Sequence, residues 1–222
     1  MLALSRRSAP QEAALRARVD LRTGLVCGGC IRLADGPFQS WMGLMDSLVA
    51  AKERWRRLFE TPALSIALPF GLLEGDAAAA HLDAALAAAG FNPEAITLEI
   101  AEAEIARDEK QKGAGGPASP ESALAAAERL RSRGWGLALR AADRAKLSLD
   151  ARARNLFREL VQPRCSPFTQ FFAAETSPLV QRLDAAKAAG MVTVIERLPP
   201  DTSSACLVAA GFDRFERRCG PG

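Results

Sequence analysis

Two patterns of apolar and polar positions alternate along the chain. Short apolar runs are typical of buried strands, and longer segments with apolar residues every three or four positions are typical of helices. The expected strands are 64–68, 95–100, 136–139 and 192–195, with an extended segment at 161–165; the expected helices are 41–59, 76–89, 122–132, 151–160, 178–189 and one ending with 206–210. This alternation predicts parallel β/α architecture but does not distinguish an open sheet from a barrel.

The chain begins its ordered pattern with a hairpin. Residues 18–20 lead through Thr23-Gly24, a turn signal, into the apolar run 25–27. A polar segment rich in Gly and Pro, 107–121, interrupts the later pattern and predicts a mobile loop. With 222 residues, one large domain is the default, because an α/β barrel of this size counts as one.

Composition and charge exclude several classes of function. The formal net charge of +3 is only mildly basic, and the densest basic cluster, 52–57, has the pattern of a solvated helix face, so no nucleic-acid binding is expected. No apolar stretch approaches the length of a membrane-spanning helix. The first ten residues lack the apolar core of a secretory signal, which favours a cytoplasmic protein.

Five cysteines are scattered along the chain, which is typical of reduced thiols in the cytoplasm. Cys27 and Cys30 have the spacing of a zinc or redox pair. A zinc site needs two further ligands, however, and the chain has one histidine, His81, and no second C-x-x-C motif. We therefore expect buried or half-buried thiols rather than a metal or redox centre, and no cofactor.

Four short motifs follow one another along the chain, at 19–24, 98–102, 195–198 and 211–217. Taken in this order, they resemble motifs of the EAL family of cyclic-di-GMP phosphodiesterases. Residues 19–24 are similar to the family's first hairpin, Ile-Val-Asp-Leu-x-Thr-Gly, and 98–102 resemble its Leu-Glu-Ile-Thr-Glu strand. Residues 195–198 fall where the family has Ala-Glu-Gly-Val-Glu, and 211–217 where it has Gly-x-Asp-x-x-Gln-Gly. The resemblance implies an EAL-like (β/α) barrel over 18–219, mostly parallel with one antiparallel strand, after an N-terminal extension, 1–17.

For such a family the resemblance implies hydrolysis of cyclic-di-GMP by a metal-activated water, with two divalent ions held by carboxylates at the C-terminal ends of the strands. The resemblance also identifies where this sequence departs from that pattern. Cys30 stands in place of the Glu of Glu-Ala-Leu, Ala67 in place of a ligand Asn, and Arg140 and Ala141 in place of paired aspartates. Among the acidic positions, Glu99 and Glu196 remain. Divalent magnesium and manganese need hard oxygen ligands, so we expect the catalysis to be lost.

Three functions remain open. The leading one is a catalytically inactive regulatory module that binds an unidentified protein partner or forms a homodimer, with Glu99 and Glu196 paired to arginines and Arg140–Glu99 as the first candidate pair. The second is a metal-independent cyclic-di-GMP receptor, in which Arg32 and Arg140 hold phosphates and Glu216 is a further contact. The third is a divergent phosphodiesterase. Three aromatic residues after a Pro-bounded segment form a candidate partner patch: Phe168, Phe171 and Phe172.

Overall fold

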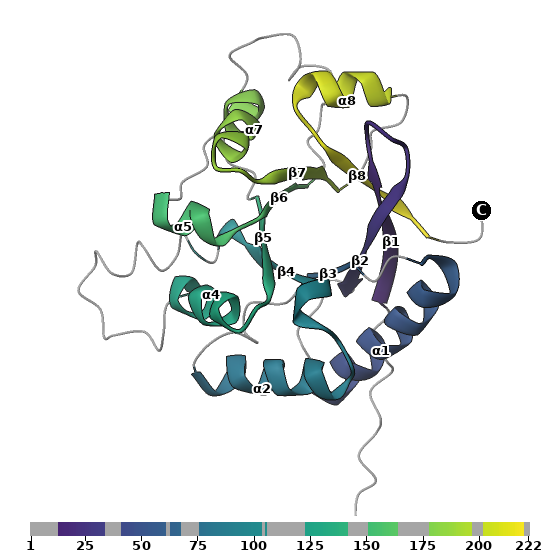
Figure 1. The fold of residues 1–222 in the computed structure, drawn as a ribbon, viewed down its shortest axis with the longest axis vertical. Coiled ribbons are helices and arrows are strands. Elements are labelled where there is room, and N and C mark those ends of the chain that lie inside the picture. Colours follow the sequence, from purple (N-terminus) through teal and green to yellow (C-terminus); the bar gives the residue numbers. More distant parts are fainter. Residues whose placement is uncertain are drawn as a thin grey trace, which may run out of the picture.

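The chain folds as a closed barrel of eight strands surrounded by helices (Figure 1). The computed structural model describes residues 13–33, 41–60, 63–67, 76–103, 105, 123–141, 151–163, 178–196 and 202–219. Each strand pairs with the next in sequence, and β8 closes the barrel against β1. The strands are β1 (Ala13–Asp20), β2 (Val26–Leu33), β3 (Leu64–Ala67), β4 (Ile96–Ala101), β5 (Gly136–Arg140), β6 (Glu159–Gln162), β7 (Val192–Ile195) and β8 (Arg214–Arg218).

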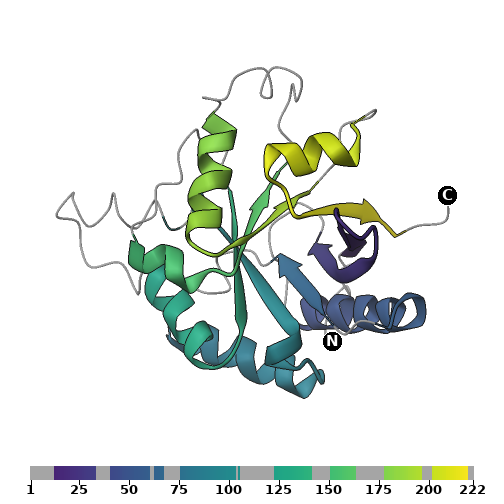
Figure 2. The ribbon, with the colours of Figure 1, turned by 45° about the horizontal axis from the view of Figure 1, so that its top comes forward.

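Helices pack on the outside of this barrel, as the turned view in Figure 2 also shows. They are α1 (Trp41–Leu58), α2 (Asp76–Ala88), α4 (Ala123–Ser132), α5 (Ala151–Leu156), α7 (Pro178–Ala188) and α8 (Ser204–Ala210), with a short 3₁₀ helix, η2 (Pro93–Ala95). Strand β1 is antiparallel to both its neighbours, β2 and β8, and all other neighbouring strands are parallel. The predicted barrel with one antiparallel strand is confirmed.

Several strands differ in extent from those expected; strand β2, for example, continues to Leu33 although the apolar run ends at 27. Strand β1 begins at Ala13, so residues 13–17, expected to belong to an N-terminal extension, are part of the barrel. Strand β6 begins at Glu159, where the sequence predicts a helix through 160, because Leu156 and Leu160 are spaced like one helix face. Strand β8 was not expected as a strand, since its sequence, RFERR, is mostly charged. The predicted loop 107–121 and the patch formed by Phe168, Phe171 and Phe172 lie outside the described residues.

Most of the apolar core lies between the barrel and the helices. Trp55 of α1 and Trp135 before β5 are both fully buried there. Trp55 lies directly against Gly29 of β2, where an added Cβ would come within 2.8 Å of the indole ring. Glycine at this position therefore allows α1 to pack close to the barrel. No helix in the described parts of the chain is long and apolar enough to cross a membrane.

The interior of the barrel is different, because much of it is charged. Ala138, Val161 and Val194 pack together from β5, β6 and β7, a small apolar cluster separate from the main core. Barrel interiors are usually filled by layers of branched apolar side chains. Here β1, β2, β4 and β8 contribute buried arginine and glutamate side chains instead.

Candidate functional site

The candidate site is a chain of ion pairs inside the barrel, which we call the arginine–glutamate network. Its members come from seven of the eight strands or the positions directly after them: Arg16, Arg18, Arg32, Arg140, Arg214, Glu99, Glu159, Glu196 and Glu216. Seven of these nine residues are buried, and Arg140 and Arg214 are partly exposed. Because strand side chains alternate between the two faces of a sheet, Arg16 and Arg18 both point inward while their neighbours pack outward.

Arg18 occupies the centre of the network. Its guanidinium group donates hydrogen bonds to the carboxylates of Glu99, Glu159 and Glu216, which come from three different strands. Burial alone would lower the pKa of Arg18, but the carboxylates of Glu159 and Glu99 outweigh that effect and raise it. Arg18 is therefore a permanently charged group that joins strands far apart in the sequence.

Arg32, from β2, makes a second bridge. Its Nη1 donates to Glu99 Oε2 at 3.0 Å, and its Nη2 donates to Glu216 Oε1 at 3.0 Å. Its Nε lies 3.2 Å from Glu216 Oε2 and 3.5 Å from Glu196 Oε1. All three nitrogens of the Arg32 guanidinium group thus donate hydrogen bonds to carboxylates inside the barrel, and the side chain is only 9% exposed.

The network reaches both ends of the barrel. Past the end of β7, Glu196 accepts a 2.9 Å hydrogen bond from Arg140 and lies 3.6 Å from Arg16. At the start of β6, Glu159 accepts a 2.9 Å hydrogen bond from Arg214. Each of the four glutamates of the network thus has at least two arginine partners, which is how buried charges are tolerated in proteins.

Each of these ionised groups changes the pKa of its neighbours. Burial raises the pKa of Glu99, but Arg32 and Arg18 together lower it below its usual value. Burial likewise raises the pKa of Glu196, and Arg32 and Arg140 lower it by more. Glu216 has a raised pKa because its burial and the nearby Glu99 carboxylate outweigh the effect of Arg32 and Arg18. The two buried carboxylates that share Arg18 and Arg32 therefore titrate as a pair.

The positions implied by the resemblance lie around this network. Cys30 lies in the interior, with its Sγ 3.4 Å from Glu99 Oε1. Ala67 ends β3 beside Glu99, and Ala141 directly follows β5, where its N–H donates to the Val161 carbonyl. Glu99 and Glu196 do pair with arginines, but the expected pair Arg140–Glu99 is wrong. Arg140 pairs with Glu196, because Arg18 and Arg32 already occupy both oxygens of Glu99.

Cys27 does not join Cys30 in a two-thiol site. Its Sγ contacts the backbone carbonyl of Arg18 at 3.5 Å, whereas Cys30 lies inside the barrel against Glu99. Burial raises the pKa of Cys30 well above its usual value, and the carboxylates of Glu216 and Glu99 raise it further. Cys30 is therefore a neutral thiol, and the thiolate that binds metals is not favoured there.

One group of potential metal ligands occurs in the part of the chain that the structure describes. It consists of Cys30, Glu99 and Glu216, whose ligand atoms lie within 4.8 Å of one another. All four oxygens of the two carboxylates accept hydrogen bonds from Arg18 or Arg32. A divalent ion would have to displace two guanidinium groups and would stand next to their positive charges. As arranged, these residues do not fit a divalent metal.

The sequence analysis missed four of the nine residues of this network. Arg16, Arg18, Glu159 and Arg214 were not singled out, although Arg16 and Arg18 alternate with Leu15, Ala17 and Val19. That alternation is the signal that could have found them. Charged residues on one face of a strand usually face solvent, however, and only barrel closure places this face inside.

Solved structures with a similar fold were found, although the sequence comparisons gave no match. No family model matches the sequence, and no curated protein matches it significantly. Among solved structures, PaMucR phosphodiesterase in complex with c-di-GMP aligns over 96% of this chain and 91% of its own, with a TM-score of 0.65 and 15% identity. A standalone EAL protein from Vibrio cholerae, bound to c-di-GMP, aligns over 94% and 91%, with a TM-score of 0.64 and 16% identity.

A calcium and cyclic-di-GMP complex from Klebsiella pneumoniae aligns over 99% of this chain but 58% of its own, with a TM-score of 0.65 and 17% identity. The present chain thus spans little more than half of that larger protein. At identities this low, the comparisons establish architecture rather than activity. The barrel described here has the fold of EAL domains.

Proposed function

We propose that this chain is a catalytically inactive EAL-like module that acts by binding another protein in bacterial cyclic-di-GMP-linked signalling. The observation that carries the proposal is the placement of Arg18 and Arg32 on the carboxylate oxygens of Glu99 and Glu216. Guanidinium groups there neutralise the carboxylates without offering an open coordination position or a metal-bound water, which metal-assisted hydrolysis needs.

The remaining positions support the same proposal. Cys30, Ala67 and Ala141 offer a neutral thiol and two methyl groups where the resemblance implies oxygen ligands. Arg140 brings a positive charge to the C-terminal end of β5, where it pairs with Glu196. We propose that these six positions, including Glu99, are vestiges of a metal site. The four cysteines of the described chain are free, which supports a cytoplasmic setting.

The link to cyclic-di-GMP is supported by the solved structures, two of which are phosphodiesterase or EAL proteins bound to that nucleotide. A metal-independent receptor would need arginines available to the phosphates. Arg32 is buried and engaged, whereas the side chain of Arg140 is 41% exposed. The receptor hypothesis requires both arginines to contact phosphates, and only Arg140 is exposed. We therefore favour the protein-binding module.

Calorimetry tests the proposal directly. The purified chain is titrated with cyclic-di-GMP in excess magnesium and again with a chelator, and the nucleotide is then recovered and chromatographed. We expect no hydrolysis and no heat of binding under either condition. Magnesium-dependent hydrolysis to a linear dinucleotide would contradict the proposal.

Binding that survives the chelator, with the nucleotide recovered intact, would replace the proposal by the receptor. In that case Arg140→Glu should abolish the binding. The matched control is Arg158→Glu, which changes the same charge at an exposed position directly before β6.

A further inference from the structure

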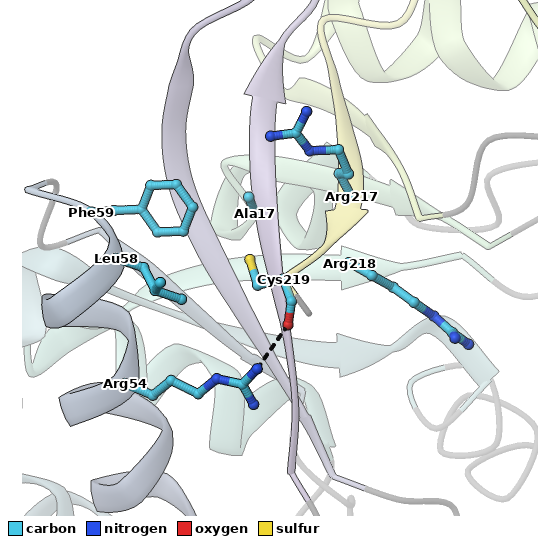
Figure 3. A pocket seen from close by; sticks show the side chains of 7 residues that line it. All are labelled: Ala17, Arg54, Leu58, Phe59, Arg217, Arg218 and Cys219. Carbon is cyan, nitrogen blue, oxygen red and sulfur yellow. Dashed lines mark hydrogen bonds between the residues drawn. The ribbon is translucent and has the colours of Figure 1, made fainter. Parts of the chain in front are cut away.

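A second feature lies outside the barrel, on the face where β1 and β8 meet the C-terminal end of α1. A pocket of about 540 Å³ opens there (Figure 3). Ala17 of β1 lines its barrel side, and the rest of the lining is Arg54, Leu58, Phe59, Arg217, Arg218 and Cys219. We call it the α1–β8 pocket; its volume lies within the range of ligand-binding sites.

One side of the pocket is apolar and held in place by the core. The ring of Phe59 packs against buried Trp55, with 4.3 Å between the ring centroids. Leu58 beside it is 51% exposed, one of only four large apolar residues in the described chain with comparable exposure. The core thus presents an aromatic ring and a leucine side chain to an occupant without further rearrangement.

The charge of the pocket is one-sided. Arg54, Arg217 and Arg218 line it, and none of them has a carboxylate partner within 4.0 Å among the described residues. Arg54 donates one hydrogen bond to the backbone carbonyl of Cys219 at 3.1 Å, which fixes its position at the edge of the pocket. Arg217 lies opposite Ala17 on the outer face of the barrel, whereas the Arg218 side chain points away from Leu58 and Phe59 (Figure 3). The two unneutralised cations beside the apolar side chains, Arg54 and Arg217, are complementary to an anionic partner with an apolar side chain.

We propose that the α1–β8 pocket binds an acidic peptide segment of a partner protein, with a large apolar side chain of that segment placed on Leu58 and Phe59. The carboxylates of the segment would pair with Arg54 and Arg217. A compact phosphate fits less well, because α1 ends at Leu58 and the carbonyl end of a helix carries partial negative charge. Carboxylates spread along a peptide can reach the two separate arginines and avoid that end.

This inference rests on the proposed function in one respect, which is that the chain binds a partner protein. It adds the surface of this chain that would bind the partner and the chemistry of the partner segment. It does not depend on the state of the barrel interior. Hydrolysis of cyclic-di-GMP would therefore overturn the proposed function and leave the peptide experiment unaffected. Failure of the peptide experiment would leave the inactive barrel unaffected.

The test measures binding of a fluorescein-labelled peptide, Ser-Asp-Glu-Leu-Phe-Glu-Asp-Ser, to the full chain by fluorescence anisotropy. One control peptide carries Asn and Gln in place of the acids, and another carries Ser-Ser in place of Leu-Phe. We expect saturable binding of the first peptide alone, weakened when salt is raised from about 0.05 to about 0.5 M because exposed charges are screened.

Two pairs of variants locate the binding. Arg217→Glu should weaken it by about tenfold or more, since a repulsive charge replaces an attractive one, and Leu58→Ser should weaken it severalfold. Their matched controls are Arg158→Glu and Val208→Ser, exposed positions outside the pocket that should bind as the unmodified chain does. Equal affinity of each variant and its control would place the binding elsewhere and overturn the proposal.

Absence of binding at millimolar peptide would also overturn it. GTP serves as a second probe in the same assay. Saturable binding of GTP that Arg217→Glu removes, without peptide binding, would assign the pocket to a small anionic ligand and overturn the peptide proposal.

Discussion

The arginines at the centre of the barrel are buried and paired with carboxylates, whereas those of the α1–β8 pocket are exposed and have no carboxylate partner among the described residues. Inside the barrel, the side chains of Arg18 and Arg32 are less than a tenth exposed, and carboxylates surround them. On the outer face, Arg54 and Arg217 are exposed, and no carboxylate of the described residues pairs with them. A buried guanidinium group must be paired to be tolerated, whereas an exposed one is hydrated and remains available to a partner.

The difference indicates which arginines hold the fold and which can serve recognition. Each interior arginine touches carboxylates from several strands, so its removal leaves uncompensated charges in the core. The outer arginines touch little of their own chain, so their removal should leave the fold intact. Four predictions test this separation, each measured as the free energy of unfolding in urea.

Arg18→Met should have the largest effect. It removes the partner shared by Glu99, Glu159 and Glu216, and breaking a buried ion pair by removing one partner costs about 3–5 kcal/mol. Arg22→Met, an exposed arginine in the turn that follows β1, is the control and should unfold as the unmodified chain does. A loss below about 1 kcal/mol for Arg18→Met would mean that the network contributes little to the fold.

Glu196→Gln should have the next largest effect, and its effect should depend on pH. Burial raises the pKa of Glu196, but Arg32 and Arg140 lower this pKa by more than burial raises it. The pKa of Glu196 in the folded chain therefore lies below the unfolded value of about 4.3. Such a carboxylate stabilises the fold above its unfolded pKa, and the contribution is lost as pH falls through the folded pKa.

The variant should therefore be less stable by roughly 1–3 kcal/mol at neutral pH, as for hydrogen bonds between charged groups. The difference in the free energy of unfolding between the variant and the unmodified chain should decrease as pH is lowered from about 5 to about 3. A difference that stays constant over this range would show that Glu196 is not held ionised by its arginines. Glu53→Gln is the control, because Glu53 pairs only loosely with Arg56 on the exposed face of α1.

Arg140→Ala should have a small effect. Its side chain is 41% exposed, and Glu196 keeps Arg16 and Arg32 nearby when Arg140 is removed. We expect a loss of about 0.2–1 kcal/mol, the range for exposed ion pairs. A loss of unfolding free energy as large as that of Arg18→Met would show that Arg140 stabilises the fold as the buried arginines do, which would contradict the expected difference between buried and exposed arginines.

Arg217→Ala should have the smallest effect, within about 0.5 kcal/mol of the unmodified chain, as for surface positions without a specific contact. The same variant should weaken binding of the acidic peptide. Marked destabilisation would indicate a structural role for Arg217 and remove the distinction between the two regions.

The apolar pattern of the chain predicts the order of the elements and most of their positions. The run 192–195 is β7 as predicted, and the helical spacing after Trp41 gives α1 within one residue of its observed end. These predictions succeed because strands and helices place apolar residues at different periods, and a buried face keeps that period. The resemblance to EAL domains, carried by short motifs in order, also predicted the single antiparallel strand.

The contacts between charged residues, in contrast, depend on how the strands close into a barrel. Arg18 and Glu216 are 198 positions apart, and their contact exists because β8 closes the barrel against β1. The pattern of β1 and β8 gives one charged face, which is equally compatible with solvent. Closure encloses that face, burial then requires each charge to find a partner, and the resulting pairs could not be read from local spacing.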